Sequence, residues 1–252
     1  MKNNKIIDFY SNSYEEDKRL GESCDNRHKV EKTIKWFYYK NVLKQYPKGI
    51  KILDVSCGTG LYSLKLAKLG YDVTACDLCP KHIALLNEKA KKKNLDIKTY
   101  VCDARELPFE ENTFDLVLLA GAIYHLPMQY KVKAIMESIR VCKIGCNILI
   151  DFLPKIHYIY QNIARYGTIH TNQEEDIFYY DSKMDMLNYV FGLNVIDYNF
   201  CCTDGITRLL GDKINTMNKH ELDDYINFYK DICMNRDFVD LSEHAIMGIK
   251  KY

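Results

Sequence analysis

The sequence predicts an α/β protein with a doubly wound, mostly parallel seven-stranded sheet. From residue 51 onward, short apolar runs alternate with helical patterns, which is typical of parallel strands joined by crossover helices. The first of these strands enters its helix through a turn with two glycines. The chain has 252 residues, 47% of them apolar, and no Gly/Ser-rich or Pro-rich linker divides it. We therefore expect a single domain.

The first two βα units follow from the spacing of the apolar residues. Residues 51–55 form the first strand, and leucines at helical spacing predict a helix over 60–69. Residues 72–77 form the second strand, and Pro80 suits the first turn of the helix after it. The same patterns predict strands at 97–103, 114–120 and 146–153 and a helix at 128–142.

The flanking segments are less regular. Residues 1–46 form an N-terminal helical flap, in which Val30, Ile34 and Phe37 mark the buried side of a helix. Residues 154–192 carry several tyrosines without periodicity, so they are expected to form an inserted cap above the core of 47–153. Residues 193–252 complete the domain with an antiparallel pair of strands at 195–200 and 244–250 and with helices at 213–217 and 221–233.

Composition excludes several classes of protein. Thirty-five Lys and Arg balance thirty-four Asp and Glu, so no net field favours nucleic acid as a partner. The charged start and the absence of a long apolar run predict no signal peptide and no membrane segment. The ten cysteines are expected to be reduced thiols of a cytoplasmic protein. Cys76 and Cys79 form a Cys-x-x-Cys pair, but no second pair lies at the same end of the sheet, so no metal is expected.

The turn after the first strand is a candidate ligand cradle. Gly58 and Gly60 allow backbone amides to approach a ligand at a helix N-terminus. Ser63 stands where a dinucleotide site needs its third glycine, and Asp54 would oppose a pyrophosphate, so a cationic or zwitterionic ligand fits better. Further acids end the second and third strands, and carboxyl ends of neighbouring parallel strands share one crevice.

Several segments then carry a resemblance. Residues 52–60 (ILDVSCGTG), 73–77 (VTACD) and 103–109 (DARELPF), followed by 114–118 (FDLVL), resemble the successive motifs of class I S-adenosylmethionine-dependent methyltransferases. The resemblance is to the small-molecule branch that includes the ubiquinone and menaquinone methyltransferases, and it covers residues 51–153. Ser56 replaces the first glycine of the family pattern, and Ile144 stands in the place of a proline.

The resemblance implies a Rossmann-like methyltransferase fold and S-adenosylmethionine as cofactor, with S-adenosylhomocysteine as product. It implies a small-molecule methyl acceptor, whose identity and methylated atom the sequence does not give; nor does it give the oligomeric state. Carried over by position, the implied contacts are Asp54 and the backbone of Ser56, Gly58 and Gly60 for the methionine part, Asp77 for the ribose, Asp103 and Ala104 for the adenine, Ala120 and Gly121 beneath the sulfonium, and Leu78 as a further contact.

Methyl transfer by direct in-line displacement depends mainly on alignment of the acceptor. His125 is the candidate base for a protonated acceptor, and the ring of Tyr124 is a candidate for cation–π contact with the sulfonium. The flap residues Tyr10, Tyr14, Arg19 and Arg27 are candidates to close over the cofactor, an arginine pairing with its carboxylate.

These residues also have purely structural interpretations: His125 as a loop histidine, and Arg19 and Arg27 as solvated surface arginines. A non-catalytic or regulatory S-adenosylmethionine-binding protein is one alternative function, because a cradle implies binding and not turnover. A nicotinamide-dependent oxidoreductase is another, disfavoured by Asp54 and Ser63.

Overall fold

Seven strands pair into one sheet in the order β3-β2-β1-β4-β5-β7-β6. The computed structural model describes residues 2–13, 19, 21, 23–168 and 178–252. Strands β1 to β5 run parallel, whereas β7 is antiparallel to both β5 and β6. The predicted fold class is confirmed. The strands are β1 (Lys51–Val55), β2 (Asp72–Asp77), β3 (Lys98–Val101), β4 (Phe114–Leu119), β5 (Cys142–Phe152), β6 (Val195–Cys202) and β7 (Ala245–Lys251).

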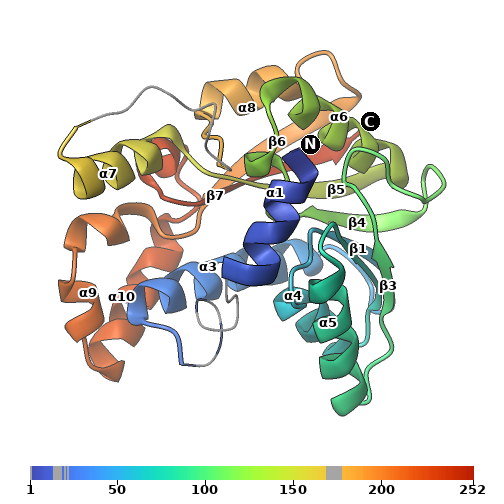
Figure 1. Cartoon of the computed structure of the whole chain (residues 1–252). Helices are drawn as coiled ribbons and strands as arrows, with labels where there is room; N and C mark the ends of the chain where they lie inside the picture. Colours follow the sequence, from blue (N-terminus) through green and yellow to red (C-terminus); the bar gives the residue numbers. More distant parts are fainter. Residues whose placement is uncertain (1, 14–18, 20, 22, 169–177) are drawn as a thin grey trace.

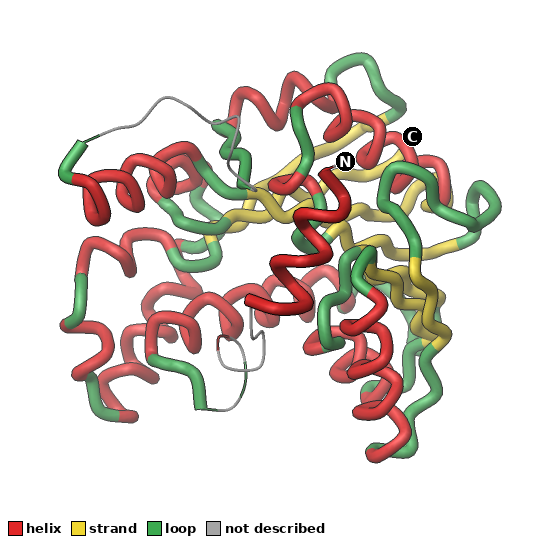
Figure 2. Tube along the Cα trace, viewed as in Figure 1, coloured by secondary structure: helices red, strands yellow, loops and turns green. Residues whose placement is uncertain are grey.

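Helices cover both faces of this sheet. In Figure 1, α3, α4, α5 and α10 lie on one side of the strands and α6 and α8 on the other, and Figure 2 shows the strands between these two layers. Helix α3 contacts α10, and α6 contacts α8. The helices are α1 (Lys2–Asp8), η1 (Phe9–Ser13), α3 (Asn26–Leu43), α4 (Leu61–Lys68), α5 (Pro80–Lys92), η2 (Ile123–His125), α6 (Met128–Val141), α7 (Lys155–Tyr166), α8 (Lys183–Val190), η3 (Gly205–Leu210), α9 (Lys213–Thr216), α10 (Lys219–Ile232) and η4 (Arg236–Leu241).

The central strands are apolar because helices bury both of their faces. Ile52 and Leu53 of β1 and Val117 and Leu118 of β4 are all fully buried. The carboxyl ends of β1, β2 and β4 meet at one edge of the sheet. Because β7 is antiparallel to β5, with Phe152 opposite Ala245, the residues just before β7 lie at this same edge. The topology thus brings the C-terminal part of the chain to the glycine turn.

Two local predictions were wrong. The fifth strand begins at Cys142 rather than at residue 146, because Cys142 already pairs with Phe114, and a register irregularity opposite Phe114 and Leu116 accommodates the extra residues of β5. In α3, Tyr38 is buried where Phe37 was expected, and Phe37 is only partly buried, since the helix turns a slightly different face to the sheet.

A buried ion pair ties the described end of the expected cap to the helical layer. Lys131 of α6 pairs with Asp181, which also accepts a hydrogen bond from the Tyr189 hydroxyl at 2.7 Å. The side chains of Lys131 and Asp181 are 2% and 3% exposed. Burial lowers the pKa of Lys131 against the opposing effect of Asp181. Helix α8 consequently packs on the sheet as part of the layer that contains α6.

The N-terminal flap lies across the carboxyl edge of the sheet, where α1 crosses in front of the strands in Figure 1. Lys81 Nζ donates to the Ser11 carbonyl oxygen at 2.5 Å, and the Ser11 hydroxyl lies 3.4 Å from Cys79 Sγ. The flap is therefore held against the loop between β2 and α5. All ten cysteines are free thiols, and no helix among the described residues is long and apolar enough to cross a membrane.

Candidate functional site

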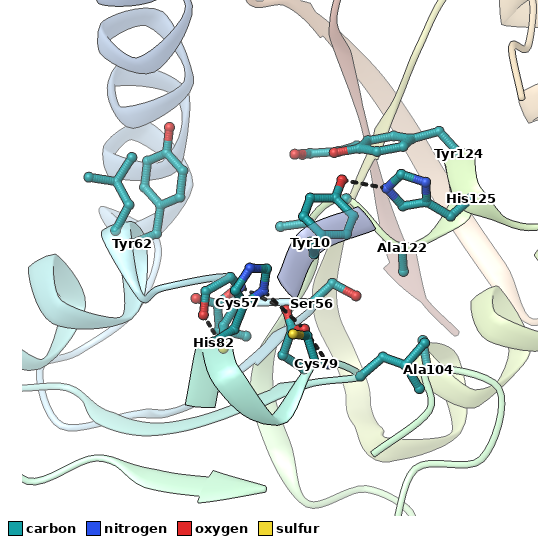
Figure 3. A pocket seen from close by; sticks show the side chains of 18 of the residues that line it. Tyr10, Ser56, Cys57, Tyr62, Cys79, His82, Ala104, Ala122, Tyr124 and His125 are labelled. Carbon is teal, nitrogen blue, oxygen red and sulfur yellow. Dashed lines mark hydrogen bonds and ion pairs between the residues drawn. The ribbon is translucent and has the colours of Figure 1, made fainter. Parts of the chain in front are cut away.

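A cavity of about 1290 Å³, including the space at its open mouth, lies at the carboxyl edge of the sheet (Figure 3). We call this cavity the main cavity. Ile6, Ile7 and Tyr10 of the flap line it together with residues from the strand ends. Most predicted site residues line it: Asp54, Ser56, Gly58, Asp77, Leu78, Asp103, Ala104, Ala120, Gly121, Tyr124, His125 and Arg19.

The glycine turn brings backbone amides to the cavity through a run of left-handed residues. Ser56 has φ +59°, Gly58 +55° and Gly60 +90°. Ser56 thus adopts a conformation that favours glycine, which is the residue the family pattern has there. Gly60 does not line the cavity; it is the N-cap residue of α4, and a Cβ there would collide with the Leu86 side chain. Gly60 therefore shapes the turn and lies outside the cavity wall.

Asp54 is the penultimate residue of β1 and is only 1% exposed. The Ser63 hydroxyl of α4 donates to Asp54 Oδ2 at 2.5 Å. Ser63, which stands where a dinucleotide-binding pattern has its third glycine, therefore holds the Asp54 carboxylate at the cavity wall. An acid fixed here suits a ligand that carries positive charge.

Asp77, at the end of β2, holds two loops at once. Its Oδ2 accepts from the Gly58 amide at 2.9 Å, and its Oδ1 accepts from the Cys79 amide at 2.8 Å and lies 3.3 Å from His82 Nδ1. A carboxylate has about four lone-pair sites, so acceptor capacity remains for a ligand hydroxyl. Asp77 therefore both orders the cradle and lines the cavity.

Asp103 follows β3, lines the cavity and is paired with a neighbour. Arg105 Nη2 donates to Asp103 Oδ2 at 2.5 Å, and Arg105 Nε donates to Oδ1 at 2.9 Å. The Arg105 guanidinium also lies over the Tyr130 ring, 5.0 Å from its centroid. This pairing fixes the Asp103 side chain next to Ala104, which also lines the cavity.

The segment after β4 carries the aromatic wall. Gly121 has φ +101°, and a Cβ on it would meet the Tyr124 hydroxyl at 2.9 Å, so Tyr124 lies directly over this turn. The Tyr10 hydroxyl of the flap lies 2.7 Å from His125 Nε2 (Figure 3). The Phe178 ring lies 5.0 Å from that of His125. His125 and Tyr124 thus face the flap inside the cavity.

The flap predictions had different outcomes. Tyr14 lies outside the described residues. Arg19 lines the main cavity and donates to Glu31 Oε1 and Oε2 at 2.9 and 2.8 Å. Arg27 lines a second cavity beside the main one, which we call the side cavity. The side cavity is lined by Tyr10, Arg19, Arg27, His28, Glu31, Tyr124, Leu153, His157, Phe178, Asp204, Glu243 and His244.

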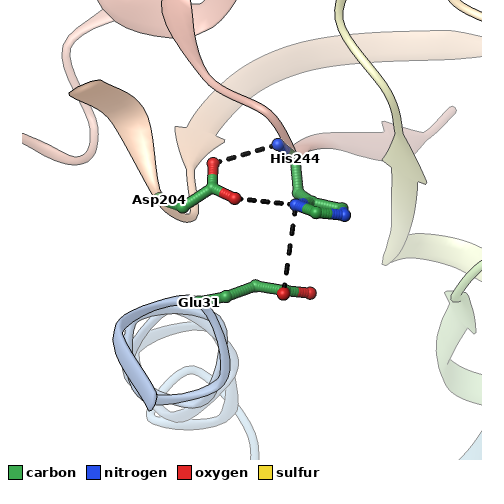
Figure 4. Close-up of side chains that lie close together, drawn as sticks. All are labelled: Glu31, Asp204 and His244. Carbon is green, nitrogen blue, oxygen red and sulfur yellow. Dashed lines mark hydrogen bonds and ion pairs between the residues drawn. The ribbon is translucent and has the colours of Figure 1, made fainter. Parts of the chain in front are cut away.

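The sequence did not single out the charged group where the two cavities meet (Figure 4). His244 Nδ1 lies 2.7 Å from Asp204 Oδ2 and 4.0 Å from Glu31 Oε2. Burial opposes ionisation of both His244 and Glu31, but Glu31 and Asp204 raise the pKa of His244, and Arg19 leads the groups that lower the pKa of Glu31 to about 2. These residues come from α3 and from the ends of β6 and β7, which only the tertiary fold brings together.

A second buried pair lines the main cavity close by. Lys35 of α3 pairs with Asp151 Oδ2, and Asp151 Oδ1 is buried with no hydrogen-bond partner among the described residues. Burial raises the pKa of Asp151 although Lys35 opposes it. Asp151 is an acid near the end of the parallel strand β5. The reasoning that predicted Asp54 and Asp77 as site residues from their places near strand ends could therefore also have predicted Asp151.

One group of three potential metal ligands occurs in the described part of the chain. Ligand atoms of Glu31, Asp204 and His244 lie within 4.8 Å of one another. Arg19 already brings a positive charge to Glu31 and places Nη2 2.9 Å from His244 Nε2. An ordinary charge network accounts for this group, and the expectation that the protein needs no metal stays a prediction.

Sequence comparison finds similarity to known proteins in the part of the chain that runs from β1 to β5. A family model described as a methyltransferase domain matches residues 52–145. The probable S-adenosyl-L-methionine-dependent methyltransferase TehB of Haemophilus influenzae is 36% identical over 90 residues, which are 36% of this chain and 31% of that protein. The ubiquinone biosynthesis O-methyltransferase of Methylocella silvestris is 38% identical over 78 residues, 31% of this chain and 30% of that protein. The chain thus spans about a third of the length of these relatives.

Solved structures extend the similarity to the whole fold. Magnesium protoporphyrin IX methyltransferase from Synechocystis, solved with bound SAM, superimposes with a TM-score of 0.61 at 12% identity, covering 100% of this chain and 98% of that chain. At 12% identity, this match shows that the two proteins share a fold and carries no conclusion about activity. Together the comparisons confirm the resemblance to class I S-adenosylmethionine-dependent methyltransferases that residues 52–145 carry.

Proposed function

We propose that this chain, whose residues 52–145 match the family model of a methyltransferase domain, binds S-adenosylmethionine and transfers its methyl group to a small-molecule acceptor. The observation that carries the proposal is the common location of the strand-end acids. Asp54, Asp77 and Asp103 line one cavity with the glycine turn between them. This arrangement offers carboxylates to a cationic, hydroxyl-bearing ligand and would repel a pyrophosphate.

Apart from Gly60, the residues carried over from the family pattern as cofactor contacts all line the main cavity. Asp77 keeps acceptor capacity for ribose hydroxyls beyond its own backbone contacts. Asp103, fixed by Arg105, and Ala104 would hold the adenine. Asp54 and the amides after Ser56 would hold the methionine part.

When bound, the cofactor supplies a methyl group already activated by its positive sulfur. The protein then needs chiefly to align the acceptor and to exclude water. The small residues Ala120 and Gly121 leave room at the turn after β4, and the Tyr124 ring beside them can face a cation. His125 is held by the Tyr10 hydroxyl, so the flap and the β4 segment form one wall around the reacting atoms.

Two alternatives make different predictions. A regulatory protein would bind S-adenosylmethionine without turning it over, and an oxidoreductase would bind a nicotinamide nucleotide. The position of Asp54 and Ser63, joined by a hydrogen bond at the cradle, disfavours a pyrophosphate. Neither alternative is favoured by a specific contact of its own.

Calorimetric titration of the full chain with S-adenosylhomocysteine and, separately, with NADH tests the proposal. We expect micromolar binding of S-adenosylhomocysteine and none of NADH. Incubation with radiolabelled S-adenosylmethionine and pooled small acceptors then tests turnover. Tight NADH binding without S-adenosylhomocysteine binding would refute the proposal, and binding without label transfer would favour the regulatory alternative.

A further inference from the structure

We propose that Asp151, near the carboxyl end of β5, takes the proton of the methyl acceptor, and that this acceptor is a largely apolar molecule carrying a hydroxyl or an amine. This inference rests on the proposed function and assigns the acceptor side of the main cavity.

Asp151 lies beside the place where the family pattern expects the methyl group. Strand β5 pairs with β4 so that Ile150 is opposite Leu119, and Asp151 and Ala120 are the next residues of the two neighbouring segments. Both line the main cavity, and the family pattern places Ala120 beneath the sulfonium. Because neighbouring strands lie about 4.8 Å apart, an acceptor above Asp151 can reach the methyl group from the β5 side.

The cavity wall beyond Asp151 offers an apolar surface. Strand β7 lies on the side of β5 that faces away from the cradle, and Ile246 is opposite Asp151 in the sheet. Phe152, Ala245 and Ile246 line the main cavity there. None of the three is among the cofactor contacts that the family pattern implies. Their side chains therefore favour an acceptor that places mostly carbon against this wall.

The other charged residues on this side of the cavity bond one another. Arg19 donates to Glu31 Oε1 and Oε2 at 2.9 and 2.8 Å, and its Nη2 lies 2.9 Å from His244 Nε2. His244 Nδ1 lies 2.7 Å from Asp204 Oδ2. This network leaves neither nitrogen of the His244 ring open to an acceptor.

Asp151 has an oxygen that a ligand can still satisfy. Its Oδ2 pairs with Lys35, whereas Oδ1 is buried and has no hydrogen-bond partner in the part of the chain that the structure describes. A buried carboxylate oxygen without a donor costs free energy, and an acceptor hydroxyl or amine supplies that donor. The side chain is 12% exposed and belongs to the cavity wall. The terminal torsion of an aspartate is broad, so a small rotation brings Oδ1 to the cavity.

The groups packed around Asp151 suit a proton acceptor. Burial raises its pKa above the usual 3.8, Lys35 and His244 act against this increase, and Glu31 adds to it. A higher pKa strengthens the carboxylate as a base, while Lys35 favours the ionised form that a base requires. The remaining titratable groups that interact with Asp151 are neutral at pH 7, namely the hydroxyls of Tyr39 in α3 and Tyr62 in α4 and the thiol of Cys201 in β6.

The reaction step balances without another reactant. A lone pair of the acceptor oxygen or nitrogen forms the new bond to the methyl carbon, the carbon–sulfur bond breaks, and its electron pair returns to sulfur to leave a neutral thioether. The acceptor proton passes to Asp151 Oδ1, which leaves a neutral carboxylic acid. Lys35 keeps its charge, and its Nζ lies 4.9 Å from the centre of the Tyr62 ring, whose face stabilises a cation.

The first experiment needs no acceptor. Calorimetry of the full chain compares S-adenosylhomocysteine with 5′-methylthioadenosine, which lacks the amino-acid part. We expect Asp151→Asn to bind both within about twofold of wild type. If Asp151→Asn weakens S-adenosylhomocysteine tenfold or more and leaves 5′-methylthioadenosine unchanged, Asp151 holds the methionine part of the cofactor, and its assignment to the acceptor is overturned.

The second experiment measures turnover with radiolabelled S-adenosylmethionine and a panel of apolar phenols, alcohols and amines, each paired with a carboxylated analogue. Asp151→Asn should lower the rate about 10²- to 10⁴-fold. The apolar member of each pair should react about tenfold faster or more. Asp115→Asn is the matched control, because Asp115 is a strand acid that pairs with Lys143 at 2.7 Å and lines neither cavity.

The pH profile tests the proton transfer in a protein that keeps Asp151. In wild type the rate should rise with pH through the midpoint of Asp151. Lys35→Met removes the cation that lowers this pKa, so the rise should move to higher pH by about one unit or more. This variant decides the matter if Asp151→Asn does not fold. An unchanged pH profile in Lys35→Met would overturn the role of Asp151 as base.

The outcomes separate the two proposals. Failure of wild type to bind S-adenosylhomocysteine contradicts the proposed function. Binding together with a wild-type rate in Asp151→Asn shows that the Lys35–Asp151 pair is structural and overturns this inference alone. Binding without turnover of any panel member, or turnover of the carboxylated analogues only, overturns the assigned class of acceptor.

Discussion

Replacing Asp77 by asparagine tests whether the acid at the end of β2 is a ligand residue, a structural residue, or both. In the native protein its two oxygens accept from the Gly58 and Cys79 amides at 2.9 and 2.8 Å. Asparagine keeps the size of the side chain but has one carbonyl oxygen. If that oxygen stays on Cys79, the new amide group faces the Gly58 amide, donor against donor.

The magnitude follows from these contacts. A hydrogen bond to a charged acceptor contributes about 1.5–3 kcal/mol, so loss of the Gly58 contact should lower the free energy of unfolding by about that amount. The same side chain is the expected acceptor for the ribose hydroxyls. Losing one charge-assisted contact of the same size should weaken S-adenosylhomocysteine binding about 10- to 150-fold.

Urea denaturation followed by circular dichroism measures the first effect, and calorimetry at a temperature where Asp77→Asn remains folded measures the second. Asp72→Asn is the matched control, because Asp72 begins the same strand and its exposed carboxylate pairs with Lys98 at 3.0 Å, far from the cavity. If Asp77→Asn binds S-adenosylhomocysteine within twofold of wild type while stability falls, Asp77 orders the loops without contacting the cofactor, and the proposed ribose role is refuted.

Three further predictions concern stability, each measured by urea denaturation. Lys131→Met should lower the free energy of unfolding by about 3–5 kcal/mol, because it leaves Asp181 as a buried unpaired charge. Adding Asp181→Leu should restore much of this stability. If the effects of the two substitutions simply add in the double variant, this prediction is contradicted. The pKa of Glu31 is lowered from 4.5 to about 2, so ionised Glu31 should stabilise the fold by about 3 kcal/mol above pH 5, and this stabilisation is lost as the pH falls toward 2. In Glu31→Gln, the free energy of unfolding should therefore depend less on pH between 5 and 2. The same pH dependence as in wild type would show that the pKa of Glu31 is not lowered in this way. Gly60→Ala should cost about 2–4 kcal/mol, since φ is +90° and the new Cβ meets Leu86; a wild-type midpoint would contradict the tight packing of this turn.

Prediction from sequence was most accurate where local pattern and burial agree. The parallel strands β1, β2 and β4 were placed within a residue, because both of their faces are covered and their apolar runs are almost continuous. The start of β5 was missed, since the irregularity opposite Phe114 depends on pairing with another strand and leaves no local signal.

The cradle residues were predictable for a related reason. Asp54, Asp77 and Asp103 lie in or just after the last two residues of their strands, and the carboxyl ends of parallel strands meet at one edge whatever the details of packing. The sequence also indicated the glycine turn, but it did not show that Gly60 packs on Leu86 away from the cavity while Ser56 takes a left-handed conformation.

What the sequence by itself determined is therefore the α/β class, the order of the βα units and the family resemblance, because these depend on periodicity and on short motifs. Only the tertiary structure decided that His244, Asp204 and Glu31 meet beside the cradle. The physical reason is that β7 runs antiparallel between β5 and β6, so the start of β7 and the end of β6 lie at the carboxyl edge of β5. Contacts between residues about two hundred positions apart follow from sheet order, which no local pattern encodes.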